Sequence, residues 1–324
     1  MENTTSIICE TACSHEGSVK RLKKFIDFAG KNKIEYIQFQ VWKKENISTE
    51  NNPNFKKLSK LEINYKNWRK IINYSRKVFP RLKIICCIYE METLKFCIAN
   101  KINHFKLHAS EVDNSDLLNL IRRKNLNLNL SVGSISDTRI KKALKKSNKN
   151  KTCLMYGLQL FPTDHKIINL SNITNIKKKF KVHVGYQDHT NPKNILSNIL
   201  PLVSIGQGSR FIEKHITDIR SIKRTDSEAA FTIQEFKKFL KIYRATLESL
   251  FSDKKKFNLA VNKYIKYYKK VVVAKKNIKK NEKFSKKNLS LKWAKTLKKS
   301  LNKVDHLIGK ISKKNYIKDQ IIIF

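Results

Sequence analysis

Two histidines stand where short apolar runs give way to polar residues. His189 lies in 183-HVGYQDHT-190, and His215 lies in 211-FIEKHIT-217. If these runs are neighbouring strands, two neutral imidazoles at their ends can bind one divalent metal ion and leave positions for water or substrate. The pair therefore predicts a metal site, whereas a lone histidine is more often a hydrogen-bonded structural residue, the interpretation we favour for His104, His165 and His306.

Other polar residues end the remaining apolar runs, although strand interiors should be apolar. They are Glu10, Gln38, Gln40, Lys106, His108, Glu111, Ser131, Gln159 and Asp188, with Glu213 and Lys214 just before His215. Residues two apart in a strand point to the same side, so several of these groups can share one site. The two lysines indicate either phosphate or carboxylate binding or a structural ion network with Glu10, Glu111 or Glu213, and the sequence leaves both open.

Eight short apolar runs alternate with amphipathic segments in the part of the chain that holds these residues. The runs are 6–11, 35–40, 83–89, 104–109, 126–132, 152–158, 181–186 and 210–216, and the clearest helical segments are 18–32, 65–79, 136–147 and 232–251. Eight strand–helix alternations predict an α/β fold, a (β/α)8 TIM barrel, whose active site lies at the C-terminal ends of the strands. A doubly wound open sheet is the alternative, which the lack of a glycine-rich nucleotide-binding pattern after the first run disfavours.

The residue composition and the hydrophobic pattern of the sequence change near residue 252. We predict a barrel domain over 1–252, a polar, lysine-rich linker over 253–266 and a small β-rich domain over 267–324. Short β-like runs at 268–275, 289–294 and 320–324 support the last of these. A domain of this size is only marginally stable alone, so we expect it to pack on the barrel or on a partner subunit.

Composition excludes several classes of protein. The formal net charge of +43 comes almost entirely from lysine spread over the whole chain, whereas a dedicated nucleic-acid binder would concentrate basic residues on one face. No run is long enough to cross a bilayer, and the N-terminus lacks the pattern of a secretory signal, which predicts a cytoplasmic protein. The six cysteines form no C-x-x-C pair and are expected to be structural.

These motifs resemble those of the sialic acid synthases, the N-acetylneuraminate synthase-like family with a C-terminal antifreeze-like (SAF) domain. The family's patterns G-Y-S-D-H-T and I-E-K-H-x-T are the most specific, and they appear here as 185-GYQDHT-190 and 212-IEKHIT-217. The resemblance runs nearly end to end. It also covers 9-CETACSHEG-17, 37-IQFQ-40, 106-KLHASE-111, and, for the SAF domain, 271–292 with 308-IGK-310.

The resemblance implies a transferase that condenses phosphoenolpyruvate with an N-acetylated amino sugar, giving a nonulosonic (2-keto) acid and phosphate for surface polysaccharide biosynthesis. It implies a divalent ion held by His189 and His215. Mn2+ is the expected ion, and Mg2+ or Co2+ are the alternatives. Glu10 and Glu111 are the implied catalytic residues beside the two histidines. The implied substrate-binding residues are Gln38, Gln40, Lys106, Ser131, Gln159, Phe161, Gln187 and Asp226. The resemblance also implies homodimers that exchange SAF domains. From composition, we expect no specific nucleic acid and no membrane as a partner.

Several positions depart from the family pattern. Gln38 stands where the family has lysine, Gln187 and Ala109 where it has serine, and Gln159 and Phe161 where asparagine and tyrosine are expected. In the SAF segment Trp293 replaces an arginine, while Lys43 could restore the charge lost at position 38. These changes predict an altered acceptor sugar. The competing hypotheses are a metal-dependent barrel hydrolase or isomerase, and a catalytically weakened paralogue with a binding role.

Overall fold

The computed structural model describes residues 5–251, 254–295 and 300–323, and it divides into two compact units. The first unit ends at Leu247 and the second begins at Glu248. Each has a hydrophobic core of its own. No helix in these described ranges is long and apolar enough to cross a membrane.

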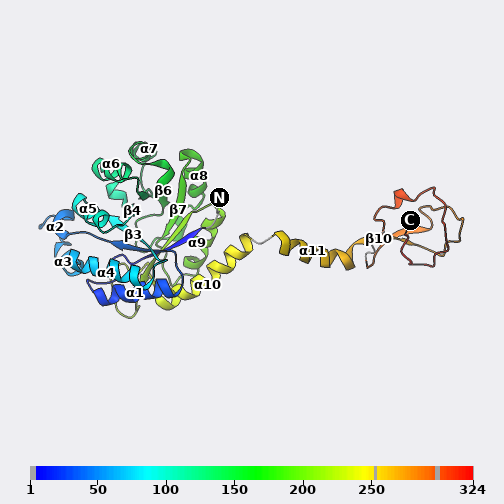
Figure 1. Cartoon of the computed structure of the whole chain (residues 1–324), viewed down its shortest axis with the longest axis horizontal. Coiled ribbons are helices and arrows are strands. Elements are labelled where there is room, and N and C mark those ends of the chain that lie inside the picture. Colours follow the sequence, from blue (N-terminus) through cyan, green and yellow to red (C-terminus); the bar gives the residue numbers. More distant parts are fainter. Residues whose placement is uncertain (1–4, 252–253, 296–299, 324) are drawn as a thin grey trace. The chain divides into compact units, whose positions relative to one another are not determined.

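The first unit is a closed parallel barrel (Figure 1). The sheet runs in chain order from β1 to β8, and β1 pairs with β8, so the (β/α)8 prediction is confirmed and the open sheet is rejected. A short β9 (Phe231–Thr232) adds to β8. The barrel strands are β1 (Ser6–Glu10), β2 (Tyr36–Gln40), β3 (Lys83–Ile88), β4 (His104–Leu107), β5 (Asn127–Ser131), β6 (Thr152–Tyr156), β7 (His183–Asp188) and β8 (Phe211–Thr217).

Helices form the outer layer, and the longer ones present one apolar stripe to the sheet. In α1 that stripe is Leu22, Phe25, Ile26 and Ala29, and the Ser18 hydroxyl caps its first turn by accepting the Arg21 N–H. The outer helices are α1 (Val19–Lys31), α2 (Lys44–Ile47), α3 (Phe55–Leu61), α4 (Tyr65–Val78), α5 (Met91–Ala99), α6 (Ser115–Arg123), α7 (Asp137–Lys145), α8 (Ser171–Phe180), α9 (Leu196–Gly206) and α10 (Ile233–Leu250).

The inside of the barrel changes from apolar to polar along the strands. Alternation places every second residue inside. The floor is an apolar cluster of Ile8, Ile85, Cys153, Met155 and Phe211, from the first residues of several strands. The residues that follow on the same inner faces are polar, including Glu10 after Ile8 and Glu213 after Phe211. The sequence therefore gathers its ionisable groups at the C-terminal end of the barrel.

The second unit begins with a helix and continues as a small β structure. Of the segment expected as a linker, 254–266 lies within α11 (Lys254–Tyr268), and residue 253 lies outside the described ranges. Strands β10 (Lys270–Ala274) and β11 (Leu289–Trp293) pair antiparallel. The run expected at 320–324 contributes single bridges, Val273 to Ile321 and Ser300 to Ile323, and residue 324 lies outside the described ranges. Its core contains Val272, Ala274, Ile278, Phe284, Leu289, Leu307, Tyr316 and Ile322.

All six cysteines are buried and unpaired by disulfides, which agrees with the structural role expected for them. Cys9 and Cys86 pack in the layer between the sheet and the helices. Cys153 lies in the apolar floor of the barrel, and Cys13 packs with Trp42 and Leu61. Burial raises the pKa of the Cys13 thiol well above its usual value, so it is not a reactive thiolate at neutral pH.

Candidate metal centre and substrate site

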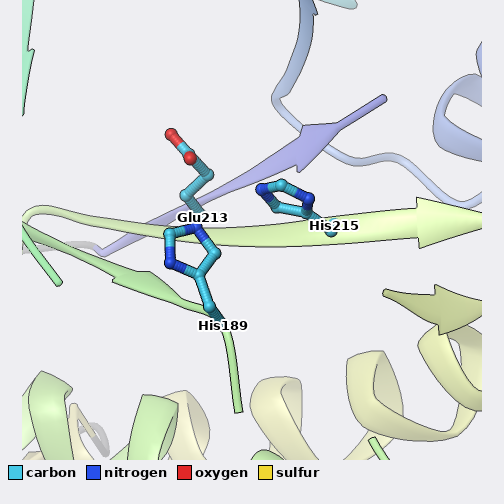
Figure 2. A group of neighbouring side chains, drawn as sticks. All are labelled: His189, Glu213 and His215. Atoms are coloured by element: carbon cyan, nitrogen blue, oxygen red, sulfur yellow. The ribbon is translucent and has the colours of Figure 1, made fainter. Parts of the chain in front are cut away.

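Three side chains could hold a metal ion at the C-terminal end of the barrel. One nitrogen of His189, one nitrogen of His215 and one carboxylate oxygen of Glu213 all lie within 4.8 Å of one another, and all three residues are buried. Figure 2 shows the two imidazoles and the carboxylate grouped across β7 and β8. Glu213 and His215 are two apart in β8 and so share its inner face, and His189 follows the last residue of β7.

Both histidines are neutral and suited to binding a metal. The His189 Nδ1–H donates to the Leu158 carbonyl at 2.6 Å, which fixes the tautomer and leaves the Nε2 lone pair for a metal. Burial lowers the pKa of His189 to about 4. Burial, with His189 and Lys106 nearby, lowers the pKa of His215 well below its usual value, and its Nδ1 is buried without a hydrogen-bond partner among the described residues. Two neutral imidazoles and a carboxylate are a donor set that divalent transition metals accept.

Glu213 is held by two neighbours inside the barrel. Lys106 Nζ lies 2.5 Å from one carboxylate oxygen, and the Gln38 amide donates to the other at 3.2 Å. Burial alone would lower the pKa of Lys106, but the charge of Glu213 reverses this and raises it. Of the two interpretations of this lysine, the structure therefore supports an ion pair, although the ammonium still lies beside the candidate metal ligands.

Glu10 lies next to this group. In the sheet it is in register with Gln38 on one side and His215 on the other. One carboxyl oxygen accepts the Ala12 N–H at 2.6 Å, and the other is buried with no partner among the described residues. Burial, followed by the charge of Glu213, raises the pKa of Glu10 well above its usual value. A carboxyl group that keeps its proton at neutral pH can act as a general acid.

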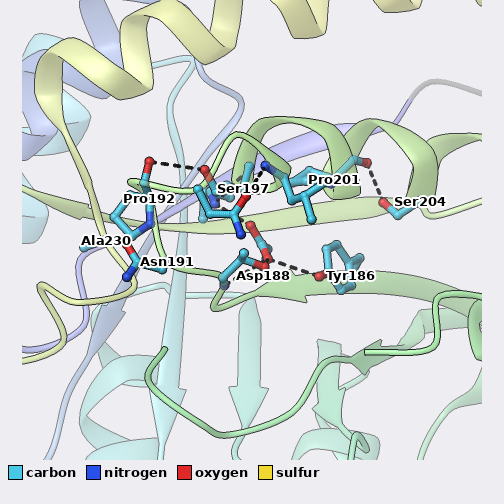
Figure 3. Close-up of polar contacts among 12 residues, drawn as sticks. Tyr186, Asp188, Asn191, Pro192, Ser197, Pro201, Ser204 and Ala230 are labelled. Atoms are coloured by element: carbon cyan, nitrogen blue, oxygen red, sulfur yellow. Dashed lines mark hydrogen bonds and ion pairs between the residues drawn. The ribbon is translucent and has the colours of Figure 1, made fainter. Parts of the chain in front are cut away.

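The second lysine points away from this centre. Lys214 Nζ pairs with Asp188 and donates to the Ser197 carbonyl at 3.3 Å, in the layer outside the barrel. Its ammonium also lies 3.9 Å from the centre of the Phe231 ring. Tyr186 donates to the same carboxylate at 3.1 Å (Figure 3). Lys214 attracts this carboxylate strongly enough to lower the pKa of Asp188 despite its burial. Lys214 is therefore a structural residue that joins β7, β8 and α9.

Gln187 belongs to a second hydrogen-bonded group inside the barrel. Its amide donates to the Gly157 carbonyl at 3.0 Å and accepts from the Ser131 hydroxyl at 3.1 Å. Gly157 has φ +151°, and a Cβ there would lie 2.1 Å from the Gln187 carbonyl oxygen, so only glycine fits this close approach. Two of the predicted substrate residues are thus brought together beside the metal group.

The loop after β6 brings two more predicted residues to the rim. The Phe161 ring centre lies 4.4 Å from that of His189 and 5.6 Å from that of His215. The Gln159 amide oxygen lies 3.0 Å from His108 Nε2. The amide nitrogen of Gln159 is buried and has no hydrogen-bond partner among the described residues. The same loop holds His189 through Leu158, so one segment positions both the metal ligand and the rim.

Three predicted residues stand further out. Gln40 accepts from the Tyr89 hydroxyl at 3.4 Å, and Glu111 accepts from the Asn114 amide at 2.9 Å. Asp226 is half-buried with φ +62°, and burial raises its pKa. Among the hydrogen bonds described for residues 5–251, none joins these three to the metal group. Lys43, the candidate replacement charge, pairs with Glu92 on the surface.

The sequence predicted the two histidines but not the third member of the group. Glu213 is among the polar strand-end residues that the sequence indicates, but it is not predicted there as a metal ligand, although its spacing of two from His215 in a strand places both on the inner face. The Leu158 carbonyl and the His108–Gln159 contact join different loops, and no spacing in the sequence indicates them.

Comparisons with known proteins give the same picture. The model of the NeuB family matches residues 25–256. The chain is 28% identical to the N,N'-diacetyllegionaminic acid synthase of Campylobacter jejuni, covering 98% of both chains. It is 24% identical to a pseudaminic acid synthase of the same species, covering 87% of this chain and 85% of that protein.

Solved structures share the fold. The N-acetylneuraminic acid synthetase of Leptospira borgpetersenii superposes with a TM-score of 0.69 at 24% identity, covering 76% of this chain and 86% of that one. A putative spore coat polysaccharide biosynthesis protein E of Chromobacterium violaceum gives 0.75 at 16% identity, covering 99% and 98%. Since the family model matches well over half of the sequence, the chain belongs to the NeuB family.

Proposed function

We propose that this protein is a nonulosonic acid synthase, which condenses phosphoenolpyruvate with an N-acetylated amino sugar and releases phosphate for surface polysaccharide biosynthesis. The observation that carries the proposal is the buried group of His189, Glu213 and His215 at the C-terminal ends of the barrel strands, in a chain of the NeuB family. In a TIM barrel this end is where the loops and strand ends supply catalytic side chains.

The proposed reaction forms one carbon–carbon bond. C3 of phosphoenolpyruvate attacks the aldehyde carbon of the open-chain sugar, and the aldehyde oxygen becomes a hydroxyl by gaining a proton. Water adds at C2, and phosphate leaves by cleavage of the C2–O bond, giving the 2-keto acid. A divalent ion, for which Mn2+ is the first candidate, would be held by His189 and His215, with Glu213 within reach. It would polarise the aldehyde.

Glu10 is the proposed proton donor. Its pKa is raised well above its usual value, because it is buried and lies near Glu213, and one of its oxygens has no protein partner among the described residues. A raised pKa favours the protonated carboxyl group, which can supply the aldehyde oxygen with its proton. Glu111, in the turn after β4, is proposed to bind sugar hydroxyls, since its carboxylate is only half-buried.

The remaining inner residues are proposed to bind the substrates. Lys106 is the buried ammonium beside the metal group and would attract the phosphate or carboxylate of phosphoenolpyruvate. Phe161 places an apolar ring beside the histidines, which suits a deoxygenated sugar carbon better than a hydroxyl. Gln38, Gln40, Ser131, Gln159, Gln187 and Asp226 are the proposed polar lining.

We propose 2,4-diacetamido-trideoxy sugars as the first acceptors to test, because the relatives include legionaminic and pseudaminic acid synthases. We also propose a cytoplasmic homodimer in which the second units are exchanged. The exposed Trp293, 67% accessible on β11 of the second unit, is then a side chain available to a partner's site.

The proposal is tested by phosphate release from phosphoenolpyruvate with Mn2+, across a panel of N-acetylated amino sugars, with and without a chelator. Sugar-dependent and chelator-sensitive release is the expected result, and it names the acceptor. Metal-dependent turnover of a sugar or ester without phosphoenolpyruvate would instead identify a barrel hydrolase or isomerase. Tight metal binding without turnover of any substrate would identify a binding paralogue.

A further inference from the structure

His108 and Gln159 form a hydrogen-bonded pair at the rim of the site. His108 follows β4 and Gln159 follows β6, and the imidazole Nε2 lies 3.0 Å from the amide Oε1. The other ring nitrogen, Nδ1, lies 3.4 Å from the Ser110 backbone N–H and 3.2 Å from the Ser110 hydroxyl. These contacts determine which ring nitrogen carries the proton.

The Ser110 backbone decides the tautomer. A backbone N–H can only donate, so His108 Nδ1 must accept from it and cannot carry a proton of its own. The Ser110 hydroxyl donates to the Glu111 carboxylate at 3.1 Å, so it could only accept from Nδ1, and a proton on Nδ1 would then face the Ser110 backbone N–H. Burial lowers the pKa of His108, which keeps the ring neutral. The proton therefore sits on Nε2, and Nε2–H donates to Gln159.

This tautomer fixes the orientation of the amide. With Nε2–H as donor, the Gln159 oxygen must face His108 and the NH2 group must point elsewhere. That NH2 group is buried and has no hydrogen-bond partner among the described residues. An unpaired buried donor is costly, so its retention indicates a ligand that supplies the acceptor. The neighbouring carbonyl of Leu158 holds His189, which places the amide close to the metal group.

We propose that His108 is a positioning residue, which orients the Gln159 amide so that its NH2 group donates to a substrate oxygen. The inference rests on the proposed function for the identity of the substrates. An acceptor oxygen is present on both, as a carboxylate or phosphate oxygen of phosphoenolpyruvate and as a hydroxyl or acetamido oxygen of the sugar. The kinetic test below distinguishes the two.

The first test does not depend on turnover. In the full-length protein at neutral pH, long-range 15N–1H NMR correlations of the His108 ring should show the neutral Nε2–H tautomer. The variant Gln159→Leu should shift the Nε2 resonance and leave that of Nδ1 nearly unchanged. A proton on Nδ1, or a doubly protonated ring, would overturn the inference whether or not the protein is a synthase.

The second test uses paired substitutions of His108 in the metal-loaded protein. His108→Glu can only accept, so it should draw the Gln159 NH2 group toward itself and raise the KM of one substrate about 10-fold or more. His108→Gln keeps a donor near the position of Nε2 and should restore most of the wild-type KM. Metal affinity and the unfolding midpoint should stay the same in both. The substrate whose KM rises is the one that the amide binds.

A double variant completes the test. If His108 acts through Gln159, His108→Glu combined with Gln159→Leu should be no worse than Gln159→Leu alone. Additive losses, or equal losses in His108→Glu and His108→Gln, would show that His108 does not act by orienting this amide. If no sugar in the panel is turned over, the proposed function fails, and the NMR result still decides the positioning role.

Discussion

Four of the twelve buried side-chain atoms that lack a hydrogen-bond partner among the described residues lie at the candidate site. They are a carboxyl oxygen of Glu10, the amide oxygen of Gln38, the amide nitrogen of Gln159 and Nδ1 of His215. Each such atom costs about 1–3 kcal/mol of folding free energy when it stays unsatisfied. Native proteins tolerate few of them, so a group of four beside the metal ligands indicates a site that is completed by its ligands.

The metal ligands provide the first prediction. His189→Ala and His215→Ala should each lower Mn2+-dependent turnover by about 100-fold or more, since even outer-shell changes at metal sites cost 10–100-fold. The fold should persist, because both side chains lie at strand ends and not in the apolar layers. Turnover and calorimetric Mn2+ binding, compared with wild type, check this. Full activity in either variant would remove the metal model.

A second prediction concerns His104, at the opposite end of the barrel. It is hydrogen-bonded to Asn129 at 3.1 Å, in line with the structural role expected for it, and burial lowers its pKa to about 4. Between pH 6.5 and 4 the unfolded chain binds a proton at this position and the folded chain does not. Stability therefore falls as the pH falls through this window, by about 3 kcal/mol from this residue.

The check is denaturant unfolding at several pH values between 7 and 4. His104→Asn removes the titrating ring, so its free energy of unfolding should fall less with acid than that of the wild type. His15, whose pKa burial also lowers to about 4, remains in the variant, so part of the acid sensitivity should persist. Identical pH profiles for the two proteins would contradict the assignment.

At the scale of elements, β8 organises the site by alternation. Phe211, Glu213 and His215 face the barrel interior, while Lys214 faces the helices. Its neighbours on both sides are fixed by register, with His215 beside Glu10 of β1 and Glu213 beside Gln187 of β7. One strand therefore supplies two of the three candidate ligands and an anchor for the outer layer.

The strands were predictable from sequence because each buried strand is a short apolar run between polar turns. All eight barrel strands lie within two residues of their predicted bounds, from 6–11 (observed Ser6–Glu10) to 210–216 (observed Phe211–Thr217). For Lys106 the observed partner, Glu213, is one of the three carboxylates that the sequence offers as partners. The pairing of Lys214 with Asp188 was not predicted, because the two lysines look alike in sequence and the closed barrel sends one inward and the other outward.

The outward pair gives a prediction about stability. Both side chains of Lys214 and Asp188 are fully buried, so Lys214→Met would leave an uncompensated buried carboxylate and cost about 3–5 kcal/mol. The matched control is Lys43→Met. Its partner Glu92 is half exposed and water screens the pair, so this change should cost far less. Urea unfolding compares them. Adding Asp188→Asn to Lys214→Met should recover part of the loss, and equal costs for the two lysines would refute the argument.

At the scale of the whole molecule, most of the net positive charge lies away from the candidate site. The +43 net charge is carried by 69 basic against 26 acidic residues. Lysines occur on most helices, including α1, α3, α4, α7, α8 and α10 around the barrel and α11 in the second unit. The candidate site, in contrast, contains one buried lysine, and its charge is paired with Glu213. The lysines are thus spread over many helices of both units, which favours a compositional origin of the charge over a nucleic-acid site.

This distribution of lysines predicts how the protein binds polyanions. Duplex DNA should bind weakly at low salt through counterion release, without sequence preference. If six or more phosphates are contacted, affinity should fall about 1,000-fold or more between 50 and 200 mM salt. Fluorescence anisotropy with two unrelated duplexes, at both salt concentrations, measures this. Lysines spread over many helices are not arranged to follow the groove of one duplex. Binding that persists at 200 mM salt, or that prefers one of the two duplexes, would therefore contradict this prediction and reveal a nucleic-acid site.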